Sequence, residues 1–393
     1  MISLDLAPNE NAHDAMVALS ILVQPWRWIK GKYSVLAKTK LKRFFPGHEP
    51  FLFLSARGAL YKTLQALQLK EGSEVLVLGF TCEAVVIPIT ALGLKPVFID
   101  MEDETYSAEF RSVKERLGTQ TKVIILQHTF GITPRYREEV LTLAHAKKIT
   151  VIEDLAHGFD PEVFAGDDAT SIKLLSFGRS KAISSVFGGA TLTRDAKLQE
   201  RLKNIEKRLL RPQTGFVFRC LLYKPVNVFI RASYNTAKLG RALHWLLNSI
   251  RFFPKELTER EKRGTFDDKM AALFPNAFAI LLNEQLKQFE SVTEQRKRVV
   301  AEYNDVFHSV EHVQPLCRYP VLVQERDTLM TSTKAQHIYL SRWYHTVQSP
   351  EGQCPVAERV AAEIINLPTT SISPENLKKV LKMVELHTFH HHD

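Results

Sequence analysis

The sequence contains few cysteines and no long apolar run of the kind that crosses a membrane. Its four cysteines are spread over 393 residues without the close spacing of a metal site or a disulfide framework, namely Cys82, Cys220, Cys317 and Cys354. No stretch of about eighteen uncharged apolar residues is found, which argues against a membrane-spanning helix. We therefore expect a reduced, cytoplasmic protein with no structural metal.

A secretory signal and low-complexity segments are also missing. The first apolar run, Met16–Val23, follows acidic residues, whereas a signal peptide needs a basic flank. The C-terminal cluster of His390, His391 and His392 has side chains that bind metals, but we interpret it as a loose terminus. A hydrophobic fraction of 45% is sufficient for a sizeable core, so the sequence predicts a globular protein.

Positive charge is concentrated in one part of the chain. Between Glu200 and Thr265 there are 15 Lys and Arg residues against 5 Glu, a net charge of +10, while the whole chain carries +9. Such a segment implies an anionic partner, which can be a nucleotide diphosphate, an anionic membrane surface or nucleic acid. No recognition motif accompanies the charge, so we do not expect nucleic-acid binding.

The pattern of apolar residues predicts four regions. Residues 1–48 are expected to form a helical arm in which Trp26 and Trp28 alternate with lysines. Residues 49–211 are expected to form a large α/β domain, and residues 259–393 a smaller C-terminal α+β domain. Between them, residues 212–258 form a basic, apolar helical insertion. We expect this insertion to pack on the body or on a partner subunit, and the alternative is peripheral contact of residues 212–255 with an anionic membrane.

Short apolar runs alternate with amphipathic stretches in the large domain. The runs are continuous and rich in Val, Ile and Leu, which is typical of strands buried on both faces. The expected strands are Val75–Phe80, Pro96–Asp100, Val123–His128, Ile149–Asp154 and Ile172–Phe177. Strands that alternate with helices predict a mainly parallel sheet, whose ligands bind beyond the carboxyl ends of the strands.

Three features lie at such strand ends. The first is the segment Val151-Ile-Glu-Asp154-Leu-Ala-His157, in which an acid ends a buried strand. A carboxylate is costly to bury unless a cation meets it, and a protonated pyridine nitrogen is one such cation. The alternative is that Asp154 caps a helix.

The second feature is Ser176-Phe-Gly-Arg-Ser-Lys181, followed by Gly188-Gly189. A lysine on a tight turn after a strand can form a Schiff base with an aldehyde, although an ordinary surface lysine is the alternative. The third feature is Ser55-Ala-Arg57-Gly58 between an apolar strand and a helix, where free backbone N–H groups make a phosphate site. A simple junction between a loop and a helix is the alternative there.

Taken in order, these motifs resemble a known family. The series consists of Ser55–Gly58, Gly79-Phe-Thr81-Cys82, His128-Thr-Phe-Gly131, Glu153-Asp154-Leu-Ala-His157, Ser176–Lys181 and Phe187-Gly-Gly. It resembles the nucleotide-sugar aminotransferases of the DegT/StrS type, which are fold-type I enzymes dependent on pyridoxal 5'-phosphate (PLP). Two later segments, Cys354-Pro-Val-Ala-Glu358 and Asn366-Leu-Pro-Thr369, resemble the small domain of that family.

The resemblance implies a fold, a cofactor and a set of roles. The fold would be a large α/β domain with a mostly parallel seven-stranded sheet flanked by helices, plus the smaller domain. Lys181 would hold PLP and transfer a proton, Asp154 would pair with the pyridinium nitrogen, and His157 would lie against the ring near its 3-hydroxyl. Ser176 and the backbone of Ala56 and Arg57 would hold the phosphate.

The resemblance also implies a reaction. An amino group would pass from an amino acid, most plausibly L-glutamate, to a nucleotide-linked keto sugar for polysaccharide or glycan biosynthesis. The active site would lie in a homodimer. Two positions depart from the family: Arg57 lies in the phosphate turn, and Cys82 stands where a ring-stacking aromatic is common, so ring contact there would be looser. The alternatives are a sugar dehydratase on the same fold, against which Lys181 argues, and a PLP- or sugar-binding regulator without turnover.

Overall fold

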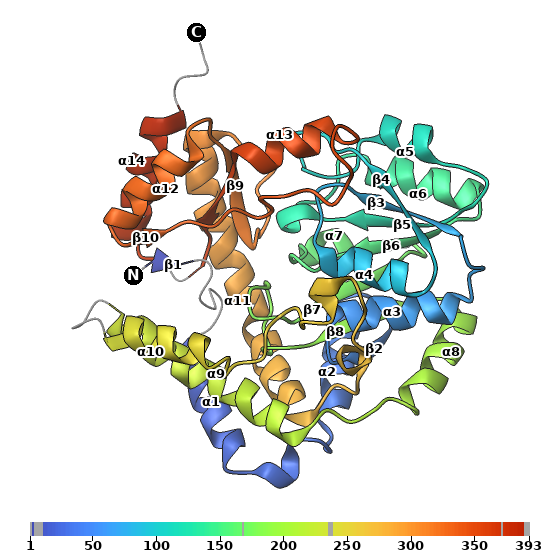
Figure 1. The fold of residues 1–393 in the computed structure, drawn as a ribbon, viewed down its shortest axis with the longest axis horizontal. Helices are drawn as coiled ribbons and strands as arrows, with labels where there is room; N and C mark the ends of the chain where they lie inside the picture. Colours follow the sequence, from blue (N-terminus) through green and yellow to red (C-terminus); the bar gives the residue numbers. More distant parts are fainter. Residues whose placement is uncertain (1, 4–10, 167–168, 235–238, 371, 389–393) are drawn as a thin grey trace. The chain divides into compact units, whose positions relative to one another are not determined.

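The computed structural model describes residues 2–3, 11–166, 169–234, 239–370 and 372–388, and the predicted histidine tail lies outside them (Figure 1). The described chain forms two compact units. The first unit is built from residues within 11–68 and 164–290, and the second from residues within 2–3, 69–163 and 291–388. Because each unit is assembled from separate stretches, the segments that carry the predicted motifs are divided between them.

The first unit contains three strands and most of its residues are helical. Its strands are β2 (Glu49–Phe53), β7 (Ile172–Ser176) and β8 (Gly189–Thr193). Its helices are α1 (Ala12–Leu22), α2 (Tyr33–Phe44), α3 (Ala56–Leu67), α8 (Ala196–Glu206), α9 (Thr214–Ser233) and α10 (Leu239–Ser249), with the 3-10 turns η1 (Pro25–Arg27), η3 (Glu261–Arg263) and η4 (Asp268–Ala271). Strand β8 pairs antiparallel with both β2 and β7.

The second unit contains the parallel strands and the C-terminal elements. Its strands are β1 (Ile2–Ser3), β3 (Glu74–Leu78), β4 (Lys95–Ile99), β5 (Thr121–Gln127), β6 (Thr150–Asp154), β9 (Arg318–Leu322), β10 (Ile338–Tyr339) and β11 (Ile364–Pro368). Its helices are α4 (Glu83–Ala91), α5 (Phe110–Arg116), α6 (Arg137–Ala146), α12 (Arg326–Ala335), α13 (Pro355–Glu363) and α14 (Pro374–Thr388), with η2 (Thr129–Gly131). The short helix α7 (Pro161–Ala165) and the long helix α11 (Asn276–Phe307) contain residues of both units.

The main sheet has seven strands in the order β2-β8-β7-β6-β5-β3-β4, as the resemblance implied. Strand β3 pairs in parallel with β4 and β5, and β5 pairs in parallel with β6. Strands β9 and β11 form a separate antiparallel pair. Right-handed crossover helices between parallel strands bury both faces of such a sheet, which explains the continuous apolar runs of its strands.

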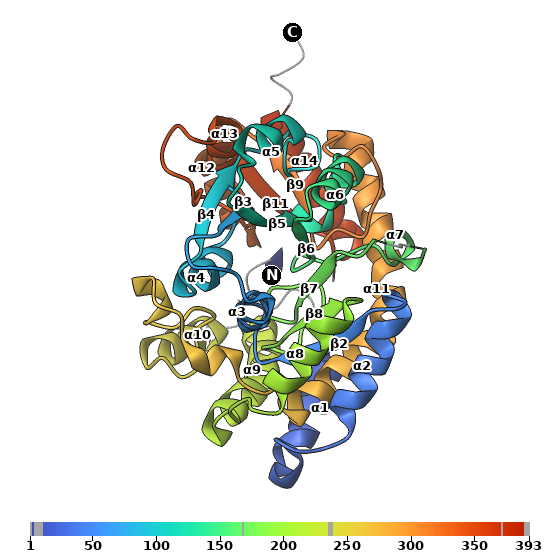
Figure 2. The ribbon, with the colours of Figure 1, turned by 90° about the vertical axis from the view of Figure 1, so that its right-hand side faces the viewer.

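The basic insertion folds as two helices with different environments. Helix α9 buries one face, including Val217, Cys220 and Leu221, and packs along α1 (Figure 2). In α10, by contrast, Gly240 is the residue that is buried, and a Cβ atom there would lie 2.3 Å from the carbonyl oxygen of Ile230. Helix α10 therefore approaches the backbone of α9 closely at Gly240, while Leu239, Trp245 and Leu246 are exposed.

Several details differ from the expectations. The long helix α11 runs without a break from Asn276 to Phe307. Of the two arm tryptophans, Trp26 is 73% exposed, but Trp28 is buried and donates its indole N–H to the Ile21 carbonyl at 2.8 Å.

Within the described ranges, no helix is long and apolar enough to cross a membrane.

Candidate active site

The predicted phosphate turn forms the N-terminus of α3 in the first unit. Ser55 is extended (φ −151°), and its hydroxyl accepts a hydrogen bond from the backbone N–H of Gly58 at 3.0 Å. The same hydroxyl donates to the carbonyl oxygen of Met270 at 2.9 Å. In the part of the chain that the structure describes, no acceptor meets the backbone N–H groups of Ala56 and Arg57. Two open donors at a helix N-terminus are suited to bind an anion.

A glycine allows strand β8 to lie directly against this turn. A Cβ atom on Gly189 would lie 2.4 Å from both the nitrogen and the Cα atom of Ala56, so a side chain has no space there. In the sheet, Gly189 is the register partner of Ser176. The end of β7, with Ser176, therefore lies beside the helix N-terminus, as the predicted phosphate site requires.

The loop after β7 brings Lys181 to the same place. A Cβ atom at Gly178 would lie 3.5 Å from Cγ of Lys181 and 3.6 Å from Oγ of Ser176. The backbone N–H of Lys181 donates to the carbonyl of Gly178 at 3.3 Å, which closes the turn. The first unit thus gathers four of the residues predicted from the sequence: Ala56, Arg57, Ser176 and Lys181.

Residues of the insertion support the loop that carries Lys181, and the sequence did not reveal them. Arg179 donates from Nη2 to the carbonyl of Pro254 at 2.6 Å and lies 4.1 Å from the ring centre of Tyr223. The buried Lys224 donates from Nζ to the carbonyl of Ser184 at 3.4 Å. The sequence contained one sign of this support, the lysine within the apolar stretch of α9, because a buried ammonium group needs hydrogen-bond acceptors.

The guanidinium group of Arg57 forms an ion pair with a carboxylate of the same chain. Its Nε lies 2.5 Å from Oε1 of Glu261, and both side chains are buried. Glu261 also accepts a hydrogen bond from the backbone N–H of Thr258 at 2.9 Å through its second oxygen. Nη2 of Arg57 is buried and has no hydrogen-bond partner among the described residues. The guanidinium group is therefore neutralised on one side and keeps one donor for a further acceptor.

Asp154 ends strand β6 in the second unit and is 5% exposed. Its Oδ1 accepts a hydrogen bond from the backbone N–H of Ala156 at 2.9 Å, which closes a turn. The alternative interpretation of Asp154 as a helix cap is wrong, because residues 155–160 are not helical and the next helix begins at Pro161. A buried carboxylate that leaves a strand into a turn is consistent with a cation-binding position.

His157 is buried among aromatic side chains of the second unit. Its Nδ1 accepts a hydrogen bond from the backbone N–H of Phe130 at 2.9 Å, so the neutral ring carries its proton on Nε2. Nε2 lies 2.7 Å from the hydroxyl oxygen of Tyr344 and donates to it. The imidazole is nearly parallel to the ring of Phe130 (19°) and lies 5.1 Å from Trp343. Both nitrogens are therefore engaged, and the orientation of the ring is fixed.

A buried charge cluster occupies the other face of β6. Glu153 accepts hydrogen bonds from Nε and Nη2 of Arg137 at 2.7 and 3.0 Å, and it lies 2.9 Å from Nε2 of His128. Because side chains alternate along a strand, Glu153 and Asp154 point to opposite faces of the sheet. His128 belonged to one of the motifs quoted from the sequence, and the structure gives it a partner in this cluster.

Other predicted motifs connect elements of the second unit. Cys82 is partly buried and directly precedes α4. Asp100 accepts the backbone N–H groups of Val356 and Ala357, at 3.1 and 3.0 Å, and so caps the helix of the Cys354 motif. Asn366 accepts the backbone N–H of Trp343 at 2.7 Å and thereby fixes the segment next to Tyr344.

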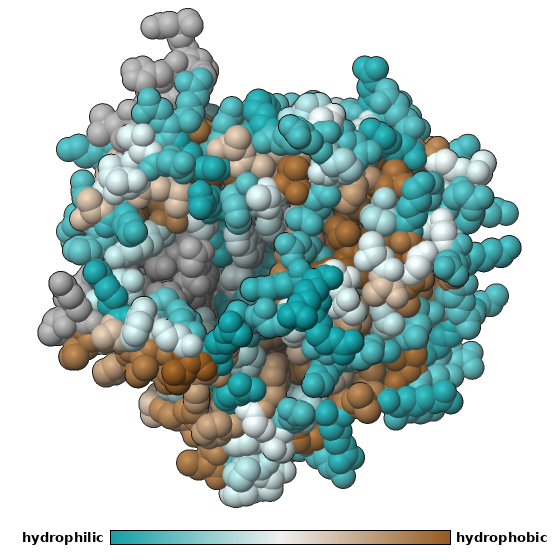
Figure 3. Space-filling view, in the orientation of Figure 1, coloured by the Kyte–Doolittle hydropathy of each residue, from teal (hydrophilic) through white to brown (hydrophobic). Residues whose placement is uncertain are grey.

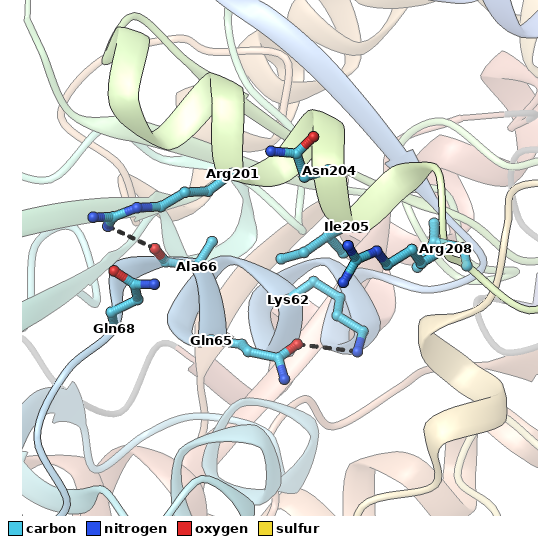
Figure 4. A pocket seen from close by; sticks show the side chains of 9 residues that line it. Lys62, Gln65, Ala66, Gln68, Arg201, Asn204, Ile205 and Arg208 are labelled. Atoms are coloured by element: carbon cyan, nitrogen blue, oxygen red, sulfur yellow. Dashed lines mark hydrogen bonds between the residues drawn. The ribbon is translucent and has the colours of Figure 1, made fainter.

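A basic pocket lies between α3 and α8, and none of the predicted site residues lines it (Figure 4). Lys62, Arg201 and Arg208 line it together with amide side chains. Lys62 donates to Gln65 at 3.1 Å and Arg201 to the carbonyl of Ala66 at 2.9 Å, as Figure 4 shows. The bond from Arg201 connects α8 to the C-terminal half of α3. Among the residues described, no cluster of three His, Cys, Asp or Glu side chains has the geometry to hold a metal ion.

Comparisons with known proteins show what the chain is similar to. GDP-perosamine synthase of Escherichia coli O157:H7 is 30% identical over 178 residues, which cover 44% of this chain and 49% of that protein. The UDP-4-amino-4-deoxy-L-arabinose–oxoglutarate aminotransferase of Shewanella sediminis is 24% identical over 79% of this chain and 70% of its own length. The chain thus spans about half the length of the first of these relatives.

Solved structures establish the fold. DesV of S. venezuelae, in complex with a ketimine intermediate, superposes with a TM-score of 0.72 at 17% identity, covering 98% of this chain and 97% of that one. The protein ntda of Bacillus subtilis, with bound cofactor PMP, gives a TM-score of 0.71 at 17% identity over 98% and 84% of the chains. The fold is that of the fold-type I PLP aminotransferases. A family model matches residues 11–215 and 266–385, and the chain belongs to the DegT/DnrJ/EryC1/StrS aminotransferase family.

Proposed function

We propose that the protein is a PLP-dependent aminotransferase that moves an amino group from L-glutamate to a keto group of a nucleotide-linked sugar. The observation that carries the proposal is the arrangement in the first unit. There, Gly189 lies against Ala56, whose backbone N–H is open like that of Arg57, and Gly189 is also the register partner of Ser176. Gly178 lies close to both the hydroxyl of Ser176 and the side chain of Lys181. An anion cradle next to a lysine is what a phosphorylated aldehyde needs.

The chain's residues fit this cofactor in their chemistry. The donors of the α3 N-terminus suit a phosphate dianion, and Gly189 lets strand β8 lie directly beside them. Asp154 supplies a buried carboxylate for a ring nitrogen. When bound, PLP supplies a carbonyl group that accepts the amine and a ring that withdraws electrons from the adjacent carbon.

Each of these residues then has a defined task. Lys181 would hold the cofactor, and its released amine Nζ would carry the proton removed from the donor carbon. Asp154 would keep a positive charge on the ring nitrogen. His157 has both nitrogens engaged, so it contributes the fixed face of its imidazole. Ser176 and the backbone at Ala56 and Arg57 fix the phosphate, which prevents the ring from rotating.

The proposal predicts a visible absorbance that L-glutamate bleaches. The protein is incubated with PLP, dialysed and titrated with L-glutamate, and then supplied with UDP-, dTDP- and GDP-linked keto sugars while an amine product is sought. Bleaching followed by amine formation on one sugar supports the proposal. A stable yellow colour that no amino acid bleaches would show a binding protein without turnover.

A second proposal concerns α10, which would attach a homodimeric enzyme to an anionic membrane surface. Leu239, Trp245, Leu246 and Ile250 are between 48% and 69% exposed. An apolar surface covers α10 and the neighbouring part of α9 (Figure 3). The surrounding segment is strongly basic, and interfacial helices combine tryptophan and leucine with such charge.

Vesicle binding tests this attachment. Co-sedimentation is measured with vesicles of phosphatidylglycerol and phosphatidylcholine for the protein and for the variant Trp245→Ser/Leu246→Ser. We expect binding that the variant loses and that high salt weakens. If the variant instead changes the mass measured by light scattering and leaves vesicle binding unaltered, the face is an interface between subunits.

A further inference from the structure

A cavity of about 310 Å³ lies in the first unit, where the start of α9, the segment after α10 and η4 meet. Eight of its twelve lining residues fall between Phe216 and Glu259. The family match ends at residue 215 and resumes at residue 266, so it leaves out the stretch that builds most of this cavity. The cavity is therefore a feature of this chain's own insertion.

Two walls of the cavity also support the candidate active site. Met270 lines it, and the carbonyl oxygen of Met270 accepts the hydrogen bond from Ser55 at the start of α3. Pro254 lines it as well, and its carbonyl oxygen accepts the hydrogen bond from Arg179, two residues before Lys181. A ligand in the cavity would thus touch the residues that position both the phosphate turn and the lysine loop.

Three cationic side chains that line the cavity form no salt bridge among the described residues: Arg219, Arg251 and Lys269. Arg251 acts on Glu259 only through its charge, which contributes to lowering the pKa of that carboxyl. Arg219 makes one long hydrogen bond, at 3.3 Å, to the carbonyl of Gly215. Arg251 has a left-handed backbone (φ 50°), a position where glycine or asparagine is usual. An arginine kept in that conformation points to a task for its side chain.

The two acids of the cavity wall are already engaged. Glu259 pairs with Lys255 at 2.8 Å, and the hydrogen bond from that lysine lowers the pKa of the Glu259 carboxyl. Asp267 accepts the backbone N–H of Lys269 at 3.2 Å and caps η4. The cations that remain give the cavity a net positive charge, which favours an anionic ligand.

Two aromatic rings also line the cavity, and each packs edge-on against a further aromatic ring. Phe253 packs against Tyr223 at 5.2 Å with an interplanar angle of 86°, and Phe216 packs against Phe187 at 5.1 Å and 65°. Phe216 and Phe253 line the cavity and are partly exposed. A partly exposed ring beside fixed cations can stack against the flat base of a nucleotide while the cations bind its phosphates.

We infer that this cavity binds the nucleoside diphosphate part of the substrate, with the base against Phe216 and Phe253 and the diphosphate at Arg219, Arg251 and Lys269. The inference rests on the proposed function and adds the place where the nucleotide is recognised. A volume of about 310 Å³ lies at the lower end of the ~300–1,000 Å³ of small-molecule sites.

Calorimetric titration of the PLP-loaded protein with UDP, dTDP, GDP and inorganic pyrophosphate tests the inference. We expect Arg219→Ala/Arg251→Ala to weaken binding of the preferred nucleoside diphosphate roughly 10- to 100-fold, because each arginine gives a charge-assisted contact. Phe253→Leu should weaken the nucleoside diphosphate several-fold and leave pyrophosphate unchanged. The matched controls are Arg260→Ala/Arg263→Ala and Phe252→Leu, which change the same residue types in neighbouring positions that do not line the cavity.

Bleaching by L-glutamate separates this inference from the proposed function, since the first half-reaction needs no nucleotide. Loss of nucleotide binding in the cavity variants, with bleaching retained, supports the inference. Equal weakening by the control variants, or unaltered binding in the double arginine variant, overturns it even when bleaching is normal. If the unaltered protein binds nucleotide in this cavity but is never bleached, the proposed function fails and the binding site stands.

Discussion

The two units hold their predicted site residues in different ways. In the first unit, the turn at Ser55 keeps backbone donors open, and glycines let β8 and the loop to Lys181 lie close to it. In the second unit, side chains are held by contacts within the unit: His157 contacts Phe130 and Tyr344, and Asp154 closes a turn. The predicted residues of the first unit thus offer donors to a ligand, whereas those of the second are held in fixed orientations.

Substitutions in the two units should therefore have different effects. Changes at the predicted residues of the first unit should affect cofactor attachment more than folding, because a ligand completes their interactions. Changes at the predicted residues of the second unit should affect the chemistry of a bound ring only where the side chain faces it. Side chains on the other face of the same strand should affect stability instead.

The largest effect is expected for Lys181→Ala. Loss of the amine removes both the covalent attachment and the proton carrier, so turnover should fall by more than about 10⁴-fold. Visible absorbance and the rate of amine formation measure the two losses. Lys197→Ala, an exposed lysine in α8, is the control and should leave both unchanged. Retained absorbance in the Lys181 variant would mean that another lysine holds the cofactor.

The neighbouring acids of β6 provide the sharpest test of the comparison. Asp154→Asn keeps an acceptor for the backbone N–H of Ala156 but loses the negative charge, so the rate should fall about 10²- to 10⁴-fold with little loss of stability. Glu153→Gln removes the buried carboxylate that faces Arg137 and leaves that arginine with its exposed partner Glu138, which should cost about 3–5 kcal/mol of unfolding free energy. Its cofactor absorbance should remain normal. Urea titrations and glutamate bleaching measure the two quantities, and a reversed pattern would contradict the assignment of faces.

Gly189→Ala should weaken cofactor binding by a smaller amount, about 10- to 100-fold, because the added methyl group meets the backbone of Ala56. Moving that backbone displaces the phosphate donors. Gly215→Ala, where a Cβ atom would meet nothing within 4 Å, is the control and should bind the cofactor normally. Titration of the cofactor-free protein with PLP gives both dissociation constants. Equal affinities of the two variants for PLP would show that the turn at Ser55 does not bind the phosphate.

Cysteine labelling should show the smallest effect. Burial raises the pKa of the Cys220 thiol to about 12 and also raises that of Cys354, so at pH 8 both remain protonated and unreactive. Cys82 is the one partly exposed cysteine of the chain. Iodoacetamide followed by peptide mass mapping should modify Cys82 first, and bound PLP should slow that modification. Labelling of Cys82 at the same rate with and without PLP would place it away from the ring.

Sequence patterns predicted the parallel half of the sheet well and the antiparallel half less well. The strands from Val75 to Asp154 are continuous apolar runs, and the structure places β3, β4, β5 and β6 there within a few residues. Strand β8 was not expected because it begins at Gly189, directly after another glycine, and such pairs are typical of turns. The identity of its partner Ser176 depends on sheet register, which no local pattern fixes.

Contacts between a predicted motif residue and a residue far from it in the sequence could not be predicted. Glu261 lies 204 residues from Arg57, and Tyr344 lies 187 residues from His157. The same holds for Pro254, which fixes the lysine loop through Arg179. Motif order identified the chain's family, but the supports of each motif arise only when distant segments fold together.

Reduction of the PLP-loaded protein with sodium borohydride, followed by peptide mass mapping of the trapped cofactor, tests directly whether Lys181 holds PLP. We expect one pyridoxyl group, attached to the peptide that contains Lys181, and its absence after prior treatment with L-glutamate. A group attached to any other lysine, or no attached group at all, would contradict it.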